Sequence, residues 1–157
     1  MKLRLINCKN VEQKEQLRNA FYFTVGKLFR KRKKLAKNIT ITINVNNQLA
    51  DKEKSWGYCQ WEDNNHSPRK FLVVLHNNKS QKRLLLTLMH ELVHVKQYAN
   101  GELKDYRSGA IRWKKKKYSG EQETDIFSIM NTPWERQAYR LSEEIYTKYK
   151  NCRQKPL

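Results

Sequence analysis

Two histidines and a glutamate stand in the order His90-Glu91-Leu92-Val93-His94, inside an apolar stretch of the chain. Residues four apart lie on one face of a helix, so two imidazoles at this spacing can bind one metal ion from the same side. Glu91 is rotated by about a third of a turn from His90 and can accept a proton from a metal-activated water. Imidazole ligands with an open position for water are typical of catalytic zinc, so the pattern predicts Zn²⁺ and hydrolysis.

A catalytic zinc usually takes three protein ligands, and this motif supplies only two. No histidine follows His94, and Asn100 stands at the position where a third histidine, six residues further on, would be. The third ligand is therefore expected to be an upstream histidine or a downstream carboxylate. The candidates are His66, His76, Glu121, Glu123, Asp125, Glu135, Glu143 and Glu144.

Glu135 is the preferred candidate for the third ligand. It lies at the expected start of the last helix, where the small side chain of Ala138, about one turn further on, leaves room for an ion. The same segment also fits a capping box, with Thr132 as the cap and Glu135 three residues later. We predict that Glu135 binds the metal, and a purely capping role is the alternative.

Hydrolysis of an amide also needs a donor near the developing negative charge. Tyr139, about one turn after Glu135, is the predicted catalytic donor, and Tyr118 and Tyr106 are alternatives. Ordinary packing would also explain each of these tyrosines. His76, at the end of an expected strand, could contact the same site.

The elements that must position these residues follow from hydrophobic periodicity. Strands are expected at 2–8, 39–45, 55–61 and 70–76, and helices at 11–34, 84–101 and 133–150. This order predicts an α+β fold: a twisted sheet of three to four strands, an N-terminal helix across it, the motif helix beneath it and a C-terminal helix that brings in the third ligand. We see no internal repeat or domain boundary, so 1–157 is interpreted as a single domain.

Access to the predicted site depends on two further segments. Residues 102–131 are polar and are expected to form a long irregular loop, with a possible hairpin near 112–118, that could act as a lid. The strand at 71–76 could accept an extended peptide at its edge, unless it is already paired on both sides.

The chain has 157 residues and a formal net charge of +18. Such an excess favours polyanions, so basic clusters at 27–37 and 112–117 are candidate nucleic-acid contacts, although solvated basic faces would look the same. Three scattered cysteines form no CxxC pair, which excludes a cysteine zinc ribbon. We find no signal peptide and no apolar run that could span a membrane, and expect a cytoplasmic monomer.

The segments HELVHVKQ and PWERQAY resemble the small zinc peptidases called minigluzincins. The first is also similar to SprT-like proteins and to small predicted metallopeptidases of bacteriophages. The minigluzincin resemblance implies a zincin-like fold with zinc bound by His90, His94 and Glu135, and with Glu91 as general base. SprT proteins use a third histidine, which this chain lacks.

These observations together predict a zinc-dependent peptidase that acts on a peptide or protein substrate. The alternative is a basic nucleic-acid-binding protein, either a DNA-associated protease of the SprT-like kind or a protein whose metal site is not catalytic.

Overall fold

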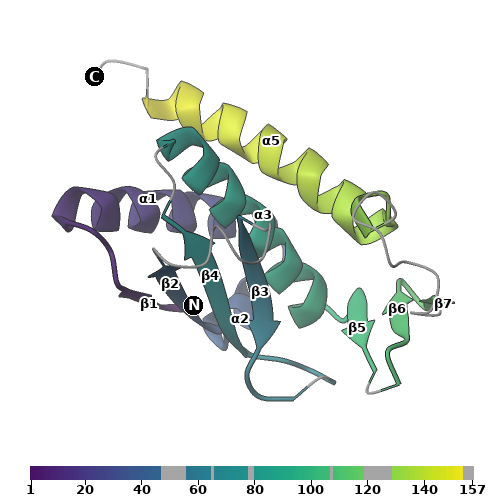
Figure 1. The fold of residues 1–157 in the computed structure, drawn as a ribbon. Helices are drawn as coiled ribbons and strands as arrows, with labels where there is room; N and C mark the ends of the chain where they lie inside the picture. The colour runs from purple at the N-terminus through teal and green to yellow at the C-terminus, as the bar shows by residue number, and fades with distance from the viewer. Residues whose placement is uncertain (47–55, 65, 78–79, 107, 119–128, 154–157) are drawn as a thin grey trace.

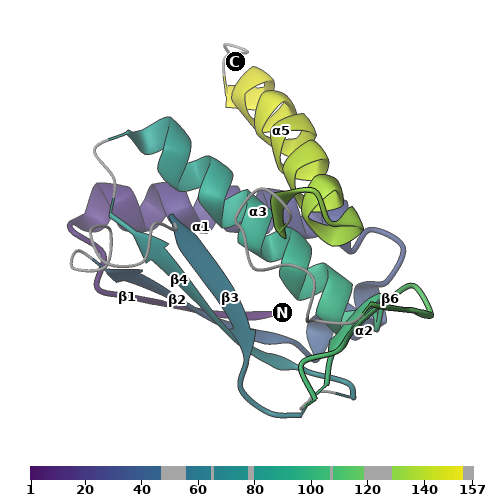
Figure 2. The same ribbon diagram turned by 45° about the vertical axis from the view of Figure 1, so that its right-hand side comes forward.

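The computed structural model describes residues 1–46, 56–64, 66–77, 80–106, 108–118 and 129–153. Within these residues the protein has an α+β fold, as the sequence predicts. The helices α1, α3 and α5 lie to one side of a mixed β-sheet, and a smaller antiparallel sheet lies beside the C-terminal end of α3 (Figure 1). Figure 2 shows that no helix covers the opposite face of the larger sheet within the described chain.

The larger sheet has the strand order β1-β2-β4-β3. Strand β1 (Lys2–Ile6) is parallel to β2 (Thr40–Asn46), and β2 is parallel to β4 (Lys70–His76). Strand β3 (Gly57–Trp61) joins β4 in antiparallel register. The expected free edge at 71–76 is therefore wrong, because β4 is paired on both sides. Among the described residues, the sheet ends at β3 instead.

The N-terminal helix is shorter than its periodicity predicts. Helix α1 (Val11–Leu28) is capped by Asn10, whose side chain accepts a hydrogen bond from the backbone N–H of Gln13, and it ends just inside the basic cluster at 27–37. A turn then leads into the short helix α2 (Lys33–Lys37). The turn buries Phe29, and α2 buries Ala36, which a straight helix to residue 34 would not bring into the same core.

Helix α3 (Gln81–Ala99) carries the His90–His94 motif. Ser80 caps its first turn, and Gly101 ends it with a φ of 70°, a backbone conformation that glycine adopts without strain. Helix α5 (Pro133–Arg153) packs along α3. Its buried side chains include Trp134, Ala138, Ser142 and Ile145, whereas Leu141 is only half-buried.

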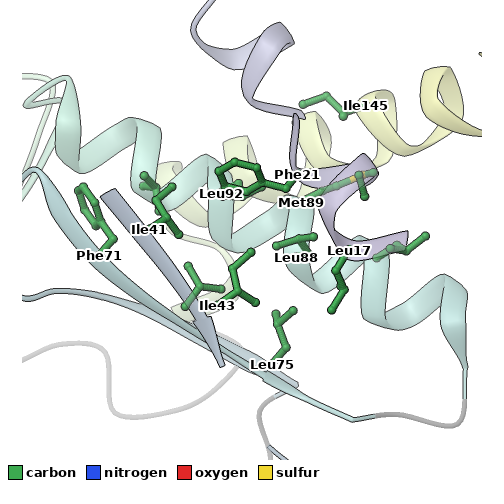
Figure 3. Packing of buried hydrophobic residues seen from close by; sticks show 14 of the residues in the cluster. Leu17, Phe21, Ile41, Ile43, Phe71, Leu75, Leu88, Met89, Leu92 and Ile145 are labelled. Atoms are coloured by element: carbon green, nitrogen blue, oxygen red, sulfur yellow. The ribbon is translucent and has the colours of Figure 1, made fainter. Parts of the chain in front are cut away.

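The hydrophobic core lies between the sheet and the helices, as Figure 3 shows. On β2, the buried apolar side chains that face the helices alternate with partly exposed polar ones on the other face, as is typical of a strand covered on one side. Strand β4 lacks this alternation, because its other face carries the apolar Leu72 and the buried Val74. The fully buried side chains that fill the space beneath α1 and α3 include Leu17, Phe21, Ile41, Ile43, Phe71, Leu75, Leu88, Met89 and Leu92.

The segment after α3 is more ordered than the expected loop. Strands β5 (Leu103–Asp105), β6 (Ile111–Trp113) and β7 (Lys116–Tyr118) form an antiparallel sheet. The predicted hairpin near 112–118 is confirmed, with its turn at two lysines of positive φ. The irregular loop predicted over 102–131 is wrong for its first part, where Leu103 and Trp113 build a small second core with Trp134. Residues 119–128 of the expected lid lie outside the described chain.

Candidate metal centre

Two helices bring the predicted ligands together. His90 and His94 lie one turn apart on α3, and Glu135 lies in the first turn of α5. One carboxylate oxygen of Glu135 is 3.1 Å from Nε2 of His90, and the other is 3.2 Å from Nε2 of His94. The two Nε2 atoms are themselves 3.1 Å apart. In the described residues, these three side chains form the cluster that could hold a metal ion.

The capping alternative for Glu135 is only half realised. The hydroxyl of Thr132 accepts the backbone N–H of Glu135 at 3.4 Å, so Thr132 does cap α5. The Glu135 carboxylate does not complete a capping box, because both of its oxygens face the imidazoles. The cap therefore sets where α5 begins, and this start directs the carboxylate toward α3.

The donor set and its spacing fit zinc. Zinc–ligand bonds of about 2.0–2.1 Å at tetrahedral angles place neighbouring ligand atoms about 3.3 Å apart. The two Nε2 atoms are 3.1 Å apart, and each lies 3.1 or 3.2 Å from a different oxygen of Glu135, so each of these separations is within a few tenths of an ångström of that value. Two imidazoles and one carboxylate also leave a position open for water or substrate, as in catalytic rather than structural zinc sites.

The charges of the metal-free cluster are strongly coupled. Burial disfavours a charged His94, but hydrogen bonds to Glu135 and Gln97 and the charge of Glu91 outweigh it and raise the His94 pKa to about 9. Burial likewise opposes ionisation of Glu135, yet hydrogen bonds from His90 and His94 lower its pKa to about 2. A carboxylate and an imidazolium therefore face each other at neutral pH when no metal is bound.

Gln97 fixes the orientation of His94. Its side chain is fully buried, and its Oε1 lies 2.8 Å from Nδ1 of His94. The Gln97 amide also donates to the carbonyl of Trp134 at 3.0 Å and to Oε1 of Gln137 at 3.1 Å. Because these two acceptors use both N–H groups of the Gln97 amide, the group that faces His94 is the oxygen Oε1, and it accepts a hydrogen bond from the Nδ1–H of His94. The lone pair of Nε2 is then left for an ion when the imidazole is neutral.

Glu91 lies in the same cleft and is buried. Burial raises the pKa of its carboxyl more than the two neighbouring imidazoles lower it. A carboxyl group of raised pKa can accept a proton and later release it. A general base in a hydrolase must perform both transfers.

A cleft of about 860 Å³ opens over the cluster. It is lined by residues of β3 and Trp56, of α3, of α5 and of the small sheet. Its side chains are more apolar than polar, as is common for binding sites with a few convergent polar groups.

Of the tyrosines singled out in the sequence, Tyr139 lines this cleft. Its ring centroid is 4.5 Å from that of His90, and burial raises the pKa of its phenol. Tyr118 packs edge-on against Trp134, and Tyr106 is exposed and does not line the cleft. Tyr98 was not predicted, although its position four residues after His94 could have indicated it. Its hydroxyl donates to Asp105 at 2.7 Å, and burial raises its pKa.

The other candidate ligands lie elsewhere. His76 is buried and does not line the cleft, and its two ring nitrogens have no hydrogen-bond partner in the described structure. The proposed contact of His76 with the site is therefore wrong. His66 is exposed in a loop, Glu144 pairs with Arg140, and Glu143 lines the cleft outside the cluster. Glu121, Glu123 and Asp125 lie outside the described residues.

Comparisons with known proteins add no assignment to this geometry. No family model matches the chain, and no significant match is found among curated proteins or solved structures.

Proposed function

We propose that this protein is a zinc-dependent metallopeptidase. The observation that carries the proposal is the convergence of His90, His94 and Glu135 from two helices, with the Glu91 carboxyl beside them in an open cleft. A zinc ion bound there would act as a Lewis acid on a carbonyl group and lower the pKa of water.

The protein's own groups supply the proton transfers. Glu91 would take a proton as water attacks the scissile carbonyl and give it to the leaving amine, a role that its buried position and raised pKa favour. Tyr139, at the cleft wall beside His90, is proposed to donate a hydrogen bond to the developing negative charge.

The shape of the cleft favours a peptide substrate. Residues Trp56 to Cys59 form its wall, and β3 ends the larger sheet among the described residues. An extended chain could add to β3 through main-chain hydrogen bonds, which would hold a peptide bond over the cluster. This edge replaces the one that the sequence suggested at 71–76.

The proposal is tested by cleavage of an unfolded protein such as casein with zinc-loaded protein. Glu91→Gln keeps the shape of the side chain but cannot accept a proton, so we expect cleavage to fall by about 10²-fold or more while zinc stays bound. The conservative change Glu144→Gln, on the outer surface of α5, is the matched control. Equal cleavage by wild type and Glu91→Gln would contradict Glu91 as the base.

A second candidate function is nucleic-acid binding, favoured by the exposed basic cluster around α2. Its side chains are all exposed and none forms an ion pair in the described residues: Lys27, Arg30, Lys31, Arg32, Lys33, Lys34 and Lys37. In the 112–117 cluster, Lys114 and Lys116 pack over aromatic rings, as Lys27 of the α2 cluster does over Phe23. Within the described chain, no helix is long and apolar enough to cross a membrane.

Binding of labelled duplex DNA across a salt series tests this candidate. A phosphate-binding surface gives an affinity that falls steeply with salt, and replacing three lysines of the α2 cluster with glutamine should flatten the slope. Casein cleavage that rises when DNA is added would indicate a DNA-associated protease. DNA binding that persists with no cleavage by wild type would favour a binding protein instead.

A further inference from the structure

The cleft over the metal centre differs in charge from the rest of the molecule. The chain carries 33 lysines and arginines against 15 acidic residues. Yet the described residues that line the cleft include four carboxylates (Glu91, Asp105, Glu135 and Glu143) and one permanently charged cation, Arg83. Arg83 is thus a positive charge among carboxylates, in a cleft whose charge is opposite in sign to that of the whole chain.

The position of Arg83 in α3 does not stabilise its positive charge. It lies in the first turn of α3, where the helix dipole is positive and disfavours a cation, and that turn holds no acidic residue. No ion pair joins its guanidinium to a carboxylate of the described chain. No carboxylate of the described chain therefore neutralises the charge of Arg83, which leaves its guanidinium available to an anionic group of a substrate.

Trp56 holds the guanidinium in place. The Arg83 Cζ lies 4.5 Å from the centre of the Trp56 ring, within the range of a cation–π contact. Trp56 itself is 47% exposed and precedes β3 at the cleft wall. Stacking uses the face of the guanidinium and leaves its N–H edge for a planar bidentate partner such as a carboxylate.

The distance from Arg83 to the cluster sets where such a partner would lie. Arg83 and His90 are seven residues apart, which puts them on one face of α3 with a separation of about 10 Å along the helix axis. An extended peptide advances about 3.3 Å per residue, so this separation spans about three residues.

We propose that Arg83, stacked on Trp56, is a substrate subsite that takes a carboxylate about three residues from the cleaved bond. This proposal rests on the proposed peptidase function and adds a substrate class to it: peptides with an acidic side chain, or a free C-terminal carboxylate, at that distance. The other cleft carboxylates repel an acidic group placed elsewhere, which makes the preference positional.

Cleavage of a peptide library derived from a whole proteome, read by mass spectrometry, tests the position. Wild type should enrich Asp and Glu about three residues from the cut. Arg83→Glu should reverse the preference to Lys and Arg, and it should fold, because a carboxylate in the first turn suits the helix dipole. Lys82→Glu makes the same charge change at an exposed residue outside the cleft and should leave the preference unchanged.

Matched peptides separate the two sources of the carboxylate. A cleaved peptide is compared with its Glu-to-Gln counterpart at the enriched position, and with its C-terminal amide. Loss of the side-chain carboxylate should lower kcat/KM by about tenfold, mainly through KM, since the subsite is remote from the reacting atoms. An effect of the amide instead would assign the subsite to a chain terminus. Cleavage with no acidic preference would overturn the subsite and leave the peptidase function standing.

A binding measurement keeps the two proposals distinguishable. Zinc-loaded Glu91→Gln protein is titrated with a fluorescein-labelled alanine-rich decapeptide that contains one glutamate, and with its glutamine counterpart. The acidic peptide should bind several-fold more tightly, and Arg83→Glu should abolish the difference. If wild type cleaves no peptide, the peptidase function fails, and equal binding of the two decapeptides would overturn the subsite as well.

Discussion

At the residue scale, the proposed zinc ion would compete with a proton for Nε2 of His94. In the metal-free protein, Nε2 of His94 lies 3.2 Å from a Glu135 oxygen, and the His94 pKa is raised to about 9. Zinc binds only the neutral imidazole, so binding at neutral pH must release the proton of His94. The charged pair holds His94 and Glu135 together without an ion, and zinc binding would require the loss of this proton.

The pH dependence of zinc binding follows from the sign of that shift. His94 is protonated below a pH of about 9, so zinc affinity should rise by up to about tenfold per pH unit between pH 7 and 8.5. Competition with a chromophoric chelator at several pH values measures this slope, and proton release in a weakly buffered solution checks it. Affinity that is flat over this range would show that His94 is already neutral.

The same pair contributes to the stability of the metal-free fold in a defined pH window. The folded-state pKa of His94 lies above its usual value of 6.5, so its contribution is full below 6.5 and disappears as the pH rises through 9. The pKa of Glu135 is lowered from 4.5, so its contribution is full above 4.5 and is lost as the pH falls toward 2. The pair therefore stabilises the apo protein most between pH 4.5 and 6.5.

Gln97 should control zinc affinity through His94. Gln97→Leu removes the acceptor for Nδ1 and should weaken zinc binding by about 10- to 100-fold, as loss of a histidine's outer partner commonly does. Gln97→Glu keeps the acceptor but loses the donor to Trp134, so it separates orientation of His94 from attachment of α5.

Chelator competition and the visible spectrum of the cobalt-substituted protein measure the effect of these changes. Gln137→Ala, which removes only a second acceptor for the Gln97 amide, is the control. A zinc affinity and a cobalt spectrum unchanged in Gln97→Leu would show that Gln97 merely fills space.

At the scale of elements, the close contact between β3 and α3 shapes the cleft. A Cβ at Gly57 would lie 2.7 Å from Cγ2 of Thr87 and 2.7 Å from the Val74 carbonyl oxygen. Since the oxygen belongs to the backbone of the neighbouring strand, it cannot move aside cheaply. Only glycine lets the wall strand approach the motif helix this closely.

Gly57→Ala should therefore destabilise the fold by about 1–3 kcal/mol, as overpacked cores do. Urea unfolding followed by circular dichroism measures the change. Gly26→Ala serves as the comparison, because a Cβ at Gly26, which is exposed on α1, meets no atom within 4 Å. Equal stability of wild type and Gly57→Ala would mean that β3 sits further from α3 than described.

The sequence predicts the elements that carry the site better than those that surround it. The apolar periodicity of α3 and the turn chemistry at Gly101 and Thr132 correctly locate both ligand helices. Glu135 could be predicted as a ligand because the motif supplies only two. The direction of its side chain, however, depends on how α5 packs on α3. No local pattern encodes that packing. The contacts of Gln97 with α5 and of Arg83 with Trp56 likewise depend on how distant segments pack.

Errors in the sequence-based elements have one physical origin. Strand pairing is a long-range property, so the sequence could not show that β3 would cover the edge of β4. The short strands β5 to β7 are polar, and they form because Leu103 and Trp113 pack on Trp134 from the distant α5. The break after Leu28 likewise reflects burial of Phe29 in the core rather than a helix-breaking residue.

For the whole molecule, the metal would link segments that are far apart in the sequence. The ligands come from two helices, 45 residues apart between His90 and Glu135. An ion that binds only the folded state at 100 times its Kd stabilises the fold by about 2.7 kcal/mol, which for a protein of this size corresponds to roughly 5–10 °C in Tm.

Zinc should therefore raise the Tm by that amount, and a chelator should reverse the rise. Differential scanning fluorimetry with and without zinc measures it. Glu135→Ala should remove most of the shift, whereas Glu144→Ala, which removes only a surface pair with Arg140, should keep it. A zinc-dependent shift that survives Glu135→Ala would place the ion elsewhere.

The convergence of His90, His94 and Glu135 on one cation is tested most directly by anomalous scattering at the zinc absorption edge from crystals grown with zinc. A single strong peak is expected within about 2.3 Å of Nε2 of both histidines and of a Glu135 oxygen, and it should be lost or much weakened in Glu135→Ala. A peak of equal strength in that variant, or one bound by other residues, would contradict the account.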